Sequence, residues 1–326
     1  MTQIRQDLFT GNMVIMASGR VRRPSDFRNI EKKKDVLEIR EDCVFCPGNE
    51  EEVPAEVERI EREGLWRVRS VPNKYPILDN NCKDECMYDL HSCIKGGGFH
   101  EVVIDTYRHN GNFFNMDIQE FFDYLSILES RYNSLKNKEN VEYITIFKNY
   151  LREAGASLEH PHSQILTIPL IPPNIAKEID KAKIFFDENG ICLHKYVMDY
   201  ERRMDKRIIH ESGSFMVMAP YASLYSNEVV IIYKYDKRFE NISIDEIEEL
   251  SMILNKLFTR MYNFLGDFPF NMYFHTDPIN IEKSNFYRWH IHITPKKGTM
   301  GGFETSTGIC VNSIRPEEVA SALRWL

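Results

Sequence analysis

The sequence has 326 residues, 43% of them hydrophobic and 28% charged, which is enough for a sizeable core and for two domains or one domain with two similar halves. The formal net charge is -8 without a long Lys/Arg block, no apolar run approaches the ~20 residues of a membrane span, and the first residues lack the apolar core of a secretory signal. Seven cysteines without such a signal argue against a disulfide framework, so we expect a cytoplasmic protein that binds neither nucleic acid nor membrane.

The first part of the chain is predicted to consist of strands and loops. A turn at Leu8–Asn12 leads into a strand at Met13–Met16, which is typical of a hairpin. The polar stretch 29–42 is expected to be a loop or an exposed helix. Another loop follows Pro72–Pro76 and ends in Gly96–Gly98, and the most informative pattern begins after these glycines.

An approximate internal repeat follows. In each copy a strand precedes an amphipathic helix, and two further strands come next, the last one near a His-x-His pair. The segments are Glu101–Ile104, Asp117–Lys136, Tyr143–Phe147 and the strand entered through His160–His162, and then Glu228–Ile231, Ile244–Phe264, Asn271–His275 and Trp289–Ile293. The intervals are similar, 59 residues from Glu101 to His160 and 62 from Glu228 to His290.

This repeat predicts an α+β fold made of two tandem units, with a mainly antiparallel sheet and flanking helices. The units are expected to span residues 1–170 and 171–326 and to meet in a common sheet or a packed pair. Unrelated strands of similar composition are the alternative.

The His160–Gln164 segment is the strongest candidate for chemistry. Side chains two apart share a face of an extended segment, so His160, His162 and Gln164 are expected to point the same way. A neutral imidazole can attack phosphorus to give a covalent phosphoramidate, and an amide can donate to a phosphoryl oxygen. Upstream, Gly155 allows close approach to the backbone and Ser157 adds a hydroxyl. On these residues alone, a metal site or polar surface is also consistent with the pair.

The run Gly155–Gln164, which reads Gly-Ala-Ser-Leu-Glu-His-Pro-His-Ser-Gln, resembles the active-site segment of galactose-1-phosphate uridylyltransferases, a branch of the histidine-triad superfamily. The resemblance covers nearly the whole chain. Other segments that are similar to this family are residues 7–12, 19–24, 43–50, 98–104 and 301–304. It implies two histidine-triad-like units, of which residues 1–170 contain the catalytic segment and a zinc knuckle, and residues 171–326 are degenerate.

The resemblance also implies roles for individual residues. His162 would be the nucleophile that takes a nucleoside monophosphate from a nucleoside-diphosphate sugar, and Gln164 would bind the phosphoryl group. The acceptor would be a sugar 1-phosphate or phosphate, in a ping-pong sequence. The positions that match nucleotide- or phosphate-contacting residues are Arg20, Arg23, Asn73, Asn149, Gly155 and Ser157. On charge alone Arg20 and Arg23 would be solvated surface, and the resemblance reverses that interpretation.

Two metal sites are implied as well. A lone Cys-x-x-Cys pair can be redox-active, but no clear βα unit follows this one. The resemblance implies zinc, and its ligands would be Cys43, Cys46, His109 and His160. A metal bond on His160 would fix the loop that aims His162, and a zinc-free knuckle is the alternative. Some family members also hold a second metal, often iron, at positions that match Glu178, His275, His290 and His292. The resemblance therefore implies a second site for iron or zinc, and a polar edge without metal is the alternative.

A third group matches no family motif that we can identify. Cys82, Cys86, His91 and Cys93 have spacing that would allow a metal, but free thiols on a surface loop are the alternative.

The resemblance leaves the base and the acceptor open. UDP-glucose:hexose-1-phosphate uridylyltransferase, an enzyme of galactose metabolism, is the first expectation. The positions that align with the family's hexose-contacting glutamine and lysine are Cys310 and Gly298, which are not equivalent. The closing segment also resembles the ADP-glucose phosphorylase branch, which passes AMP to inorganic phosphate, and a low-turnover zinc-stabilised nucleotide-binding protein is a third possibility. Family members are commonly dimers, so a homodimer is expected.

Overall fold

The computed structural model describes residues 2–20, 37–78, 93–281, 285–296, 298 and 300–325. Its strands and helices, in chain order, are β1 (Gln3–Gln6), β2 (Met13–Met16), η1 (Ser18–Arg20), η3 (Glu50–Glu52), β3 (Glu58–Arg62), β4 (Leu65–Pro72), β5 (His100–Ile104), α1 (Ile118–Leu135), β6 (Tyr143–Tyr150), η4 (Arg152–Ala154), β7 (His162–Ile168), α2 (Pro173–Asn189), α3 (Leu193–Met204), β8 (Ile208–Glu211), β9 (Phe215–Met218), β10 (Val229–Tyr233), η5 (Phe239–Asn241), α4 (Ile244–Leu265), β11 (Phe270–His275), β12 (His290–Pro295), α5 (Gly302–Thr307), β13 (Cys310–Asn312) and α6 (Pro316–Leu323). None of the helices in the described ranges has the length and apolarity that a membrane span requires.

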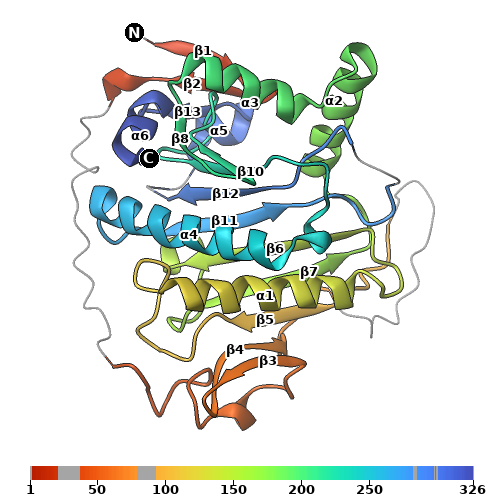
Figure 1. Ribbon diagram of the computed structural model, residues 1–326, viewed down its shortest axis with the longest axis vertical. Helices are drawn as coiled ribbons and strands as arrows, with labels where there is room; N and C mark the ends of the chain where they lie inside the picture. The colour runs from red at the N-terminus through yellow and green to blue at the C-terminus, as the bar shows by residue number, and fades with distance from the viewer. Residues whose placement is uncertain are drawn as a thin grey trace.

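A ten-stranded sheet runs through the molecule (Figure 1), and its neighbouring strands are all antiparallel. Counted outward from the centre, the two halves have the same order, β6-β7-β5-β4-β3 and β11-β12-β10-β9-β8. They join where β6 pairs with β11, with Tyr150 opposite Phe270 and Ile146 opposite Phe274. The predicted α+β class is confirmed, and the repeated strands form one common sheet.

A second, three-stranded sheet brings the two ends of the chain together. The predicted hairpin forms, with β1 antiparallel to β2, and β13 adds to β2 in parallel. Within the turn the Asp7 carboxylate accepts a hydrogen bond from the Thr10 backbone N–H at 2.8 Å, and Gly11 has a φ of 75°, which a side chain would oppose. The turn is thereby fixed.

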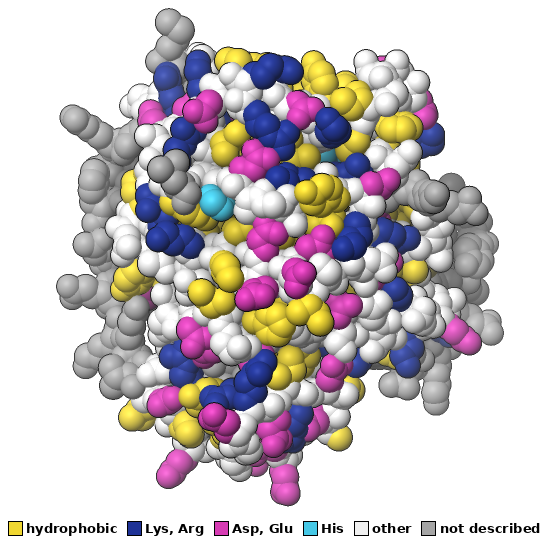
Figure 2. All heavy atoms as spheres, in the orientation of Figure 1, with side chains coloured by type: hydrophobic (Ala, Val, Ile, Leu, Met, Phe, Trp, Pro, Cys, Tyr) yellow, Lys and Arg dark blue, Asp and Glu magenta, His cyan; other side chains and the backbone are white. Residues whose placement is uncertain are grey.

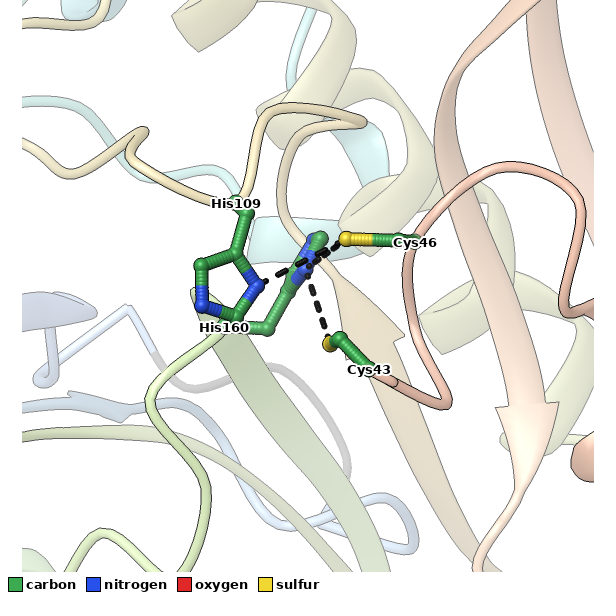
Figure 3. Close-up of side chains that lie close together, drawn as sticks. All are labelled: Cys43, Cys46, His109 and His160. Atoms are coloured by element: carbon green, nitrogen blue, oxygen red, sulfur yellow. Dashed lines mark hydrogen bonds between the residues drawn. The ribbon is translucent and has the colours of Figure 1, made fainter. Parts of the chain in front are cut away.

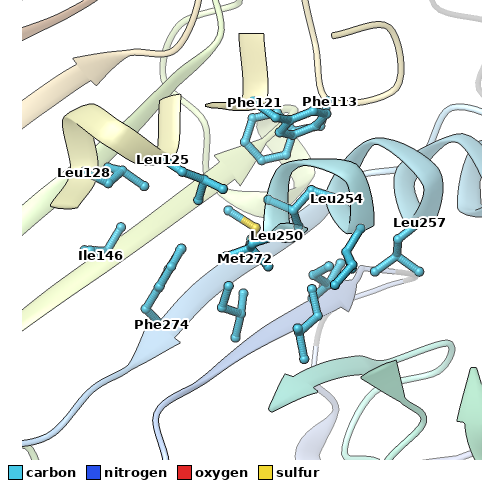
Figure 4. Close-up of a cluster of buried hydrophobic side chains, with 14 of the residues drawn as sticks. Phe113, Phe121, Leu125, Leu128, Ile146, Leu250, Leu254, Leu257, Met272 and Phe274 are labelled. Carbon is cyan, nitrogen blue, oxygen red and sulfur yellow. The ribbon is translucent and has the colours of Figure 1, made fainter. Parts of the chain in front are cut away.

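Helices α1 and α4 lie side by side across one face of the large sheet (Figure 1). Each begins with a capping box, because the Asp117 side chain accepts from Glu120 N and the Ser243 side chain accepts from Glu246 N. Side chains from both helices meet strand residues in the main core (Figure 4), where Leu128 and Leu254 are fully buried. Burying each such side chain contributes roughly 1.5–3 kcal/mol. The outer surface on this side carries interspersed acidic and basic side chains (Figure 2).

Strand alternation sends the polar side chains to the opposite face of the sheet. Val103 and Ile165 belong to the core beneath the helices, so His100 on β5 and Gln164 on β7 face away from the helices. Helices α2 and α3 cover part of this second face, where Tyr143 packs against their apolar side chains. The fold therefore separates an apolar, helix-covered face from a face with histidines and amides.

Candidate active site

Two cysteines and two histidines converge at the edge of this second face. Cys43 and Cys46 lie in the loop before η3, His109 follows β5, and His160 lies two residues before β7 (Figure 3). One potential ligand atom from each residue lies within 4.8 Å of all the others. The structure thus assembles the predicted four-residue group, which could hold a metal ion.

The spacing of the four ligand atoms fits a tetrahedral metal. Zn–S bonds of about 2.3 Å and Zn–N bonds of about 2.05 Å at tetrahedral angles separate S from N by about 3.6 Å. Cys46 Sγ lies 3.5 Å from His109 Nδ1 and 3.6 Å from His160 Nδ1, and Cys43 Sγ lies 3.6 Å from His160 Nδ1. The donor set and its geometry therefore suit zinc.

The ring of His160 is oriented by the backbone behind it. Its Nε2–H donates to the Thr106 carbonyl at 2.9 Å, which leaves Nδ1 unprotonated toward the cysteines. Burial lowers the pKa of His160 to about 3 and raises the pKa of the Cys46 thiol to about 11. A bound cation would compensate the negative charge of the thiolates in this buried site and would bind the neutral imidazole as well.

His162 is the first residue of β7, and the residue is only 6% exposed. Its Nδ1–H donates to the His160 carbonyl at 2.9 Å, so the proton is on Nδ1 and the lone pair is on Nε2. Among the described residues Nε2 has no hydrogen-bond partner, and it is not sealed from solvent. Burial lowers the pKa of His162, which favours the neutral, nucleophilic ring. The ring also packs against Phe45, with the two ring centroids 5.7 Å apart.

A buried ion pair supports this residue from below. Lys148 Nζ contacts Asp105 Oδ2 at 2.5 Å and donates to the His162 carbonyl at 3.2 Å. Both charged side chains are almost completely buried, at 1% and 0% exposure. The pair connects the end of β5 with β6 and β7 beside the candidate nucleophile. Sequence analysis missed both residues, because neither belongs to a motif.

Gln164, two residues after His162, faces the same side of the sheet and belongs to a second network. Its Oε1 accepts a hydrogen bond from His100 Nε2 at 2.8 Å. Asn73 Nδ2 lies 3.4 Å from Nδ1 and 3.2 Å from Nε2 of the same imidazole, and the Asn73 backbone N–H donates to the His100 carbonyl. The predicted residues Asn73 and Gln164 are therefore brought together by His100, whose role the sequence analysis did not foresee.

Asn149 lies at the end of β6 and is held from the other half of the sheet. Asn271 Nδ2 donates to Asn149 Oδ1 and to the Ala154 carbonyl, each at 2.7 Å. Asn149 Nδ2 approaches the carbonyl of Gly155 at 3.5 Å, and Gly155 has a φ of 95°. Asn149 is next to Lys148, which is opposite Ser163 in the register, so it lies beside His162.

The other predicted contact residues are less closely connected. Ser157 is exposed on the loop before His160 and makes no side-chain hydrogen bond within the described part of the chain. Arg20 ends η1, and Arg23 lies outside the described residues. Cys82, Cys86 and His91 of the third cysteine and histidine group also lie outside them. Cys93 is described and is disulfide-bonded, so the expectation of a metal ligand or a free thiol is wrong for this residue.

The second predicted metal group assembles on the same face, in the other half of the sheet. Potential ligand atoms of His275, His290 and His292 lie within 4.8 Å of one another. A Glu178 carboxylate oxygen lies 3.1 Å from His275 Nδ1 and 3.6 Å from His290 Nε2. Burial would raise the pKa of Glu178, but the adjacent histidines outweigh it and hold that pKa well below its usual range. An ionised carboxylate with three imidazoles suits a transition metal.

Strand register changes one expectation about the repeat. From the sequence, His160 and His162 were expected to be equivalent to His290 and His292 in the second copy. In the structure, however, β7 begins at His162 and β12 begins at His290. His162 is opposite Ile104 and His290 opposite Ile232, at the same ends of β5 and β10. His290 Nδ1–H also donates to the carbonyl two residues before it, as His162 does. The equivalence is therefore shifted by two residues, and His292 occupies the place of Gln164.

A cavity of about 930 Å³ opens on this face, and its lining includes all four residues of the second group, Glu178, His275, His290 and His292. Its wall includes Phe147 and Asn149 from the first half and Tyr273, His275 and His292 from the second. His162 itself is not part of this wall. The volume is within the ~300–1,000 Å³ of typical small-molecule sites.

Comparison with known proteins identifies related families. A family model described as "Galactose-1-phosphate uridyl transferase, N-terminal domain" matches residues 1–172, and one described as "Domain of unknown function (DUF4921)" matches residues 100–324. The ADP-glucose phosphorylase of Arabidopsis thaliana is 30% identical over 99% of this chain and 92% of that protein. The galactose-1-phosphate uridylyltransferase of Thermotoga maritima is 28% identical over 99% of this chain and 98% of that one.

The fold is similar to solved structures along its whole length. The crystal structure of the Arabidopsis thaliana ADP-glucose phosphorylase with bound ADP-glucose matches with a TM-score of 0.86 and 30% identity, covering 100% of this chain and 99% of that chain.

Proposed function

Because this chain belongs to the galactose-1-phosphate uridylyltransferase family, which extends to the ADP-glucose phosphorylases, we propose that it transfers a nucleoside monophosphate through a covalent bond to His162. The observation that carries this proposal is the hydrogen bond from His162 Nδ1–H to the His160 carbonyl. It fixes the tautomer in which Nε2 carries the lone pair. An imidazole held in this way is an activated nucleophile.

In the first displacement, Nε2 of His162 attacks the α-phosphorus of a nucleoside-diphosphate sugar. A P–N bond forms as the bond from the α-phosphorus to the bridging oxygen breaks, and the sugar 1-phosphate leaves with that electron pair. In the second displacement, an oxygen of the acceptor phosphate attacks the same phosphorus. The P–N bond then breaks, its electron pair returns to Nε2, and the nucleotide leaves. His162 needs no change of protonation in this cycle.

The residues around His162 have supporting parts. The Gln164 amide nitrogen donates to a phosphoryl oxygen, and a neutral amide adds no acidic proton that would promote hydrolysis. Asn149 offers a second amide beside the reacting phosphorus, held in place by Asn271. Preorganised donors of this kind favour charge that develops in the transition state. Arg20, Arg23, Asn73, Gly155 and Ser157 are proposed to contact the nucleotide or its phosphates.

The Cys43, Cys46, His109 and His160 group is proposed to bind zinc. Bound zinc would serve as a structural clamp here, since all four ligands come from the protein. His160 would then be rigid, and its carbonyl is the group that orients His162. The Glu178, His275, His290 and His292 group is proposed to hold a second structural metal, iron or zinc.

The donor sugar nucleotide has two candidates. UDP-glucose with a hexose 1-phosphate acceptor corresponds to the uridylyltransferase of Thermotoga maritima. ADP-glucose with inorganic phosphate corresponds to the phosphorylase of Arabidopsis thaliana, and the 30% identity and the TM-score of 0.86 favour this alternative.

The decisive experiment is to incubate the protein with UDP-glucose or ADP-glucose labelled with ³²P at the α-phosphorus, and to quench in base. We expect acid-labile label on the protein from one donor only, which names the base. Adding hexose 1-phosphate or inorganic phosphate should release the label as nucleotide product, which names the acceptor. His162→Ala should abolish the label and leave the fold intact. Zinc-loaded protein that takes up no label from either donor would contradict the enzyme and favour a nucleotide-binding protein.

We also propose a division of labour within the chain. Residues 1–170 are proposed to be the catalytic unit and residues 171–326 a degenerate copy that stabilises it. In the copy, the counterpart of the nucleophile is His290, whose Nε2 faces Glu178. We propose in addition that the protein is a homodimer, which light scattering after gel filtration would test.

A further inference from the structure

The buried imidazole of His100 has a defined tautomer. The Ile77 backbone N–H donates to His100 Nδ1 at 3.1 Å, so Nδ1 is the unprotonated nitrogen and the ring proton is on Nε2. His100 Nε2 is 2.8 Å from the side-chain oxygen of Gln164. A ring N–H must face an acceptor, so this contact also determines which end of the Gln164 amide is oxygen. His100 is 6% exposed, and its burial lowers its pKa, which keeps the ring neutral.

This contact leaves the amide nitrogen of Gln164 available. Among the described residues no acceptor takes a hydrogen bond from Gln164 Nε2, and the residue is only partly buried. If the amide rotated by half a turn, its oxygen would face the phosphoryl oxygens and repel them. We propose that His100 is a positioning residue, which holds the Gln164 amide so that its N–H donates to the phosphoryl group transferred at His162. This inference rests on the proposed function.

The second half of the sheet contains the same contact in different chemistry. His292 is opposite Val230, as Gln164 is opposite Val102, so Glu228 occupies the place of His100. Glu228 Oε1 accepts from His292 Nδ1–H at 3.1 Å. In both halves, therefore, a residue at or just before the start of one strand orients a side chain on the neighbouring strand: His100 orients Gln164, and Glu228 orients His292. In the half with His162, the oriented group is an amide whose N–H remains available.

The test compares His100→Leu, which has no donor, with His100→Gln, whose amide can still donate to Gln164 Oε1. Removing one preorganised hydrogen-bond donor lowers kcat about 10²–10³-fold. In His100→Leu the Gln164 amide is still present but free to rotate, so only part of this loss is expected. We therefore expect His100→Leu to lower kcat about ten- to hundredfold. KM for the sugar nucleotide should change little, because the charged contacts to the nucleotide remain. His100→Gln should recover most of kcat.

A double-mutant cycle separates positioning from a general structural effect. In a Gln164→Ala background, His100→Leu should have no further effect on kcat, because the group it acts through is gone. His210→Leu is the matched control at the far end of the sheet, where His210 stacks on Trp325, and it should keep wild-type kcat. If His100→Leu does not fold, His100→Gln and His100→Asn enter the same cycle.

The outcomes are distinct. Equal losses from His100→Leu in the wild-type and Gln164→Ala backgrounds, or no recovery with His100→Gln, would overturn the positioning role while label on His162 still supports transfer. Failure of the wild-type protein to take label from either sugar nucleotide would instead remove the proposed function itself.

Discussion

The buried ion pair of Lys148 and Asp105, beside His162, gives the most quantitative prediction. Lys148→Met keeps most of the side-chain volume but removes the only charge that compensates Asp105 among the described residues. At the Nζ–Oδ2 separation of 2.5 Å and an effective dielectric constant of about 20, Coulomb's law gives about 7 kcal/mol of attraction before desolvation is counted. Measured losses from breaking a buried pair are about 3–5 kcal/mol, since the remaining charge is stranded. We expect the free energy of unfolding to fall by this smaller amount.

The second variant tests the reasoning behind that number. Lys148→Met combined with Asp105→Asn removes both charges, so most of the lost stability should return. Urea unfolding, with zinc content measured in the same samples, would compare the wild type with both variants. The transfer rate should fall in both, because the His162 carbonyl has lost the Lys148 donor. A single variant as stable as the wild type, or a double variant less stable than the single, would refute the argument.

Three further changes have expected outcomes. Cys43→Ala should weaken zinc binding by more than about 10–100-fold in chelator competition and lower stability, with transfer lost only in part; unchanged zinc stoichiometry would contradict the knuckle. Asn271→Leu removes the donor to Asn149 and should lower kcat/KM for transfer about ten- to hundredfold, with label on the protein retained. Burial raises the pKa of Asp277 to about 7 in the folded protein, compared with about 3.9 in the unfolded chain. The protonated carboxyl therefore contributes fully to the free energy of unfolding below about pH 3.9, and this contribution is lost as pH rises through 7. Asp277→Asn should therefore gain up to about 3 kcal/mol relative to wild type between pH 5 and pH 8 in urea unfolding, and a pH-independent difference would contradict this.

Local sequence signals predicted much of the fold. The helix that starts after Ser243 has both a capping residue and an apolar face, and these agree with tertiary packing. The hairpin of β3 and β4 was missed, because Glu58–Arg62 is a charged edge strand with little apolar alternation. Its turn, Glu63–Gly64, has φ values of 54° and 76°. Two-residue hairpin turns with two positive φ values usually have Asn, Asp or Gly at the first position, so Glu63 gave no signal for this turn.

The candidate site was predictable in its motifs but not in its contacts. The spacing of Cys43 and Cys46, together with the family resemblance, indicated four candidate metal ligands, and the fold brings these residues together. The two-residue shift between the repeats could not be read from intervals, because register depends on which strand ends are paired. The His100–Gln164 contact likewise joins neighbouring strands 64 residues apart in sequence, and one sequence contains no signal for such a partner.

The junction of β6 with β11 means that neither half of the chain is a free-standing module. A fragment ending near residue 170 would present β6 as a bare edge, with a row of unpaired N–H and C=O groups ready to recruit a foreign strand. It would also lose β13, to which β2 is paired, and the Asn271 amide that steadies Asn149. The pairing of the late strands β11 and β13 with the early strands β6 and β2 therefore closes the edges that such a fragment would leave open.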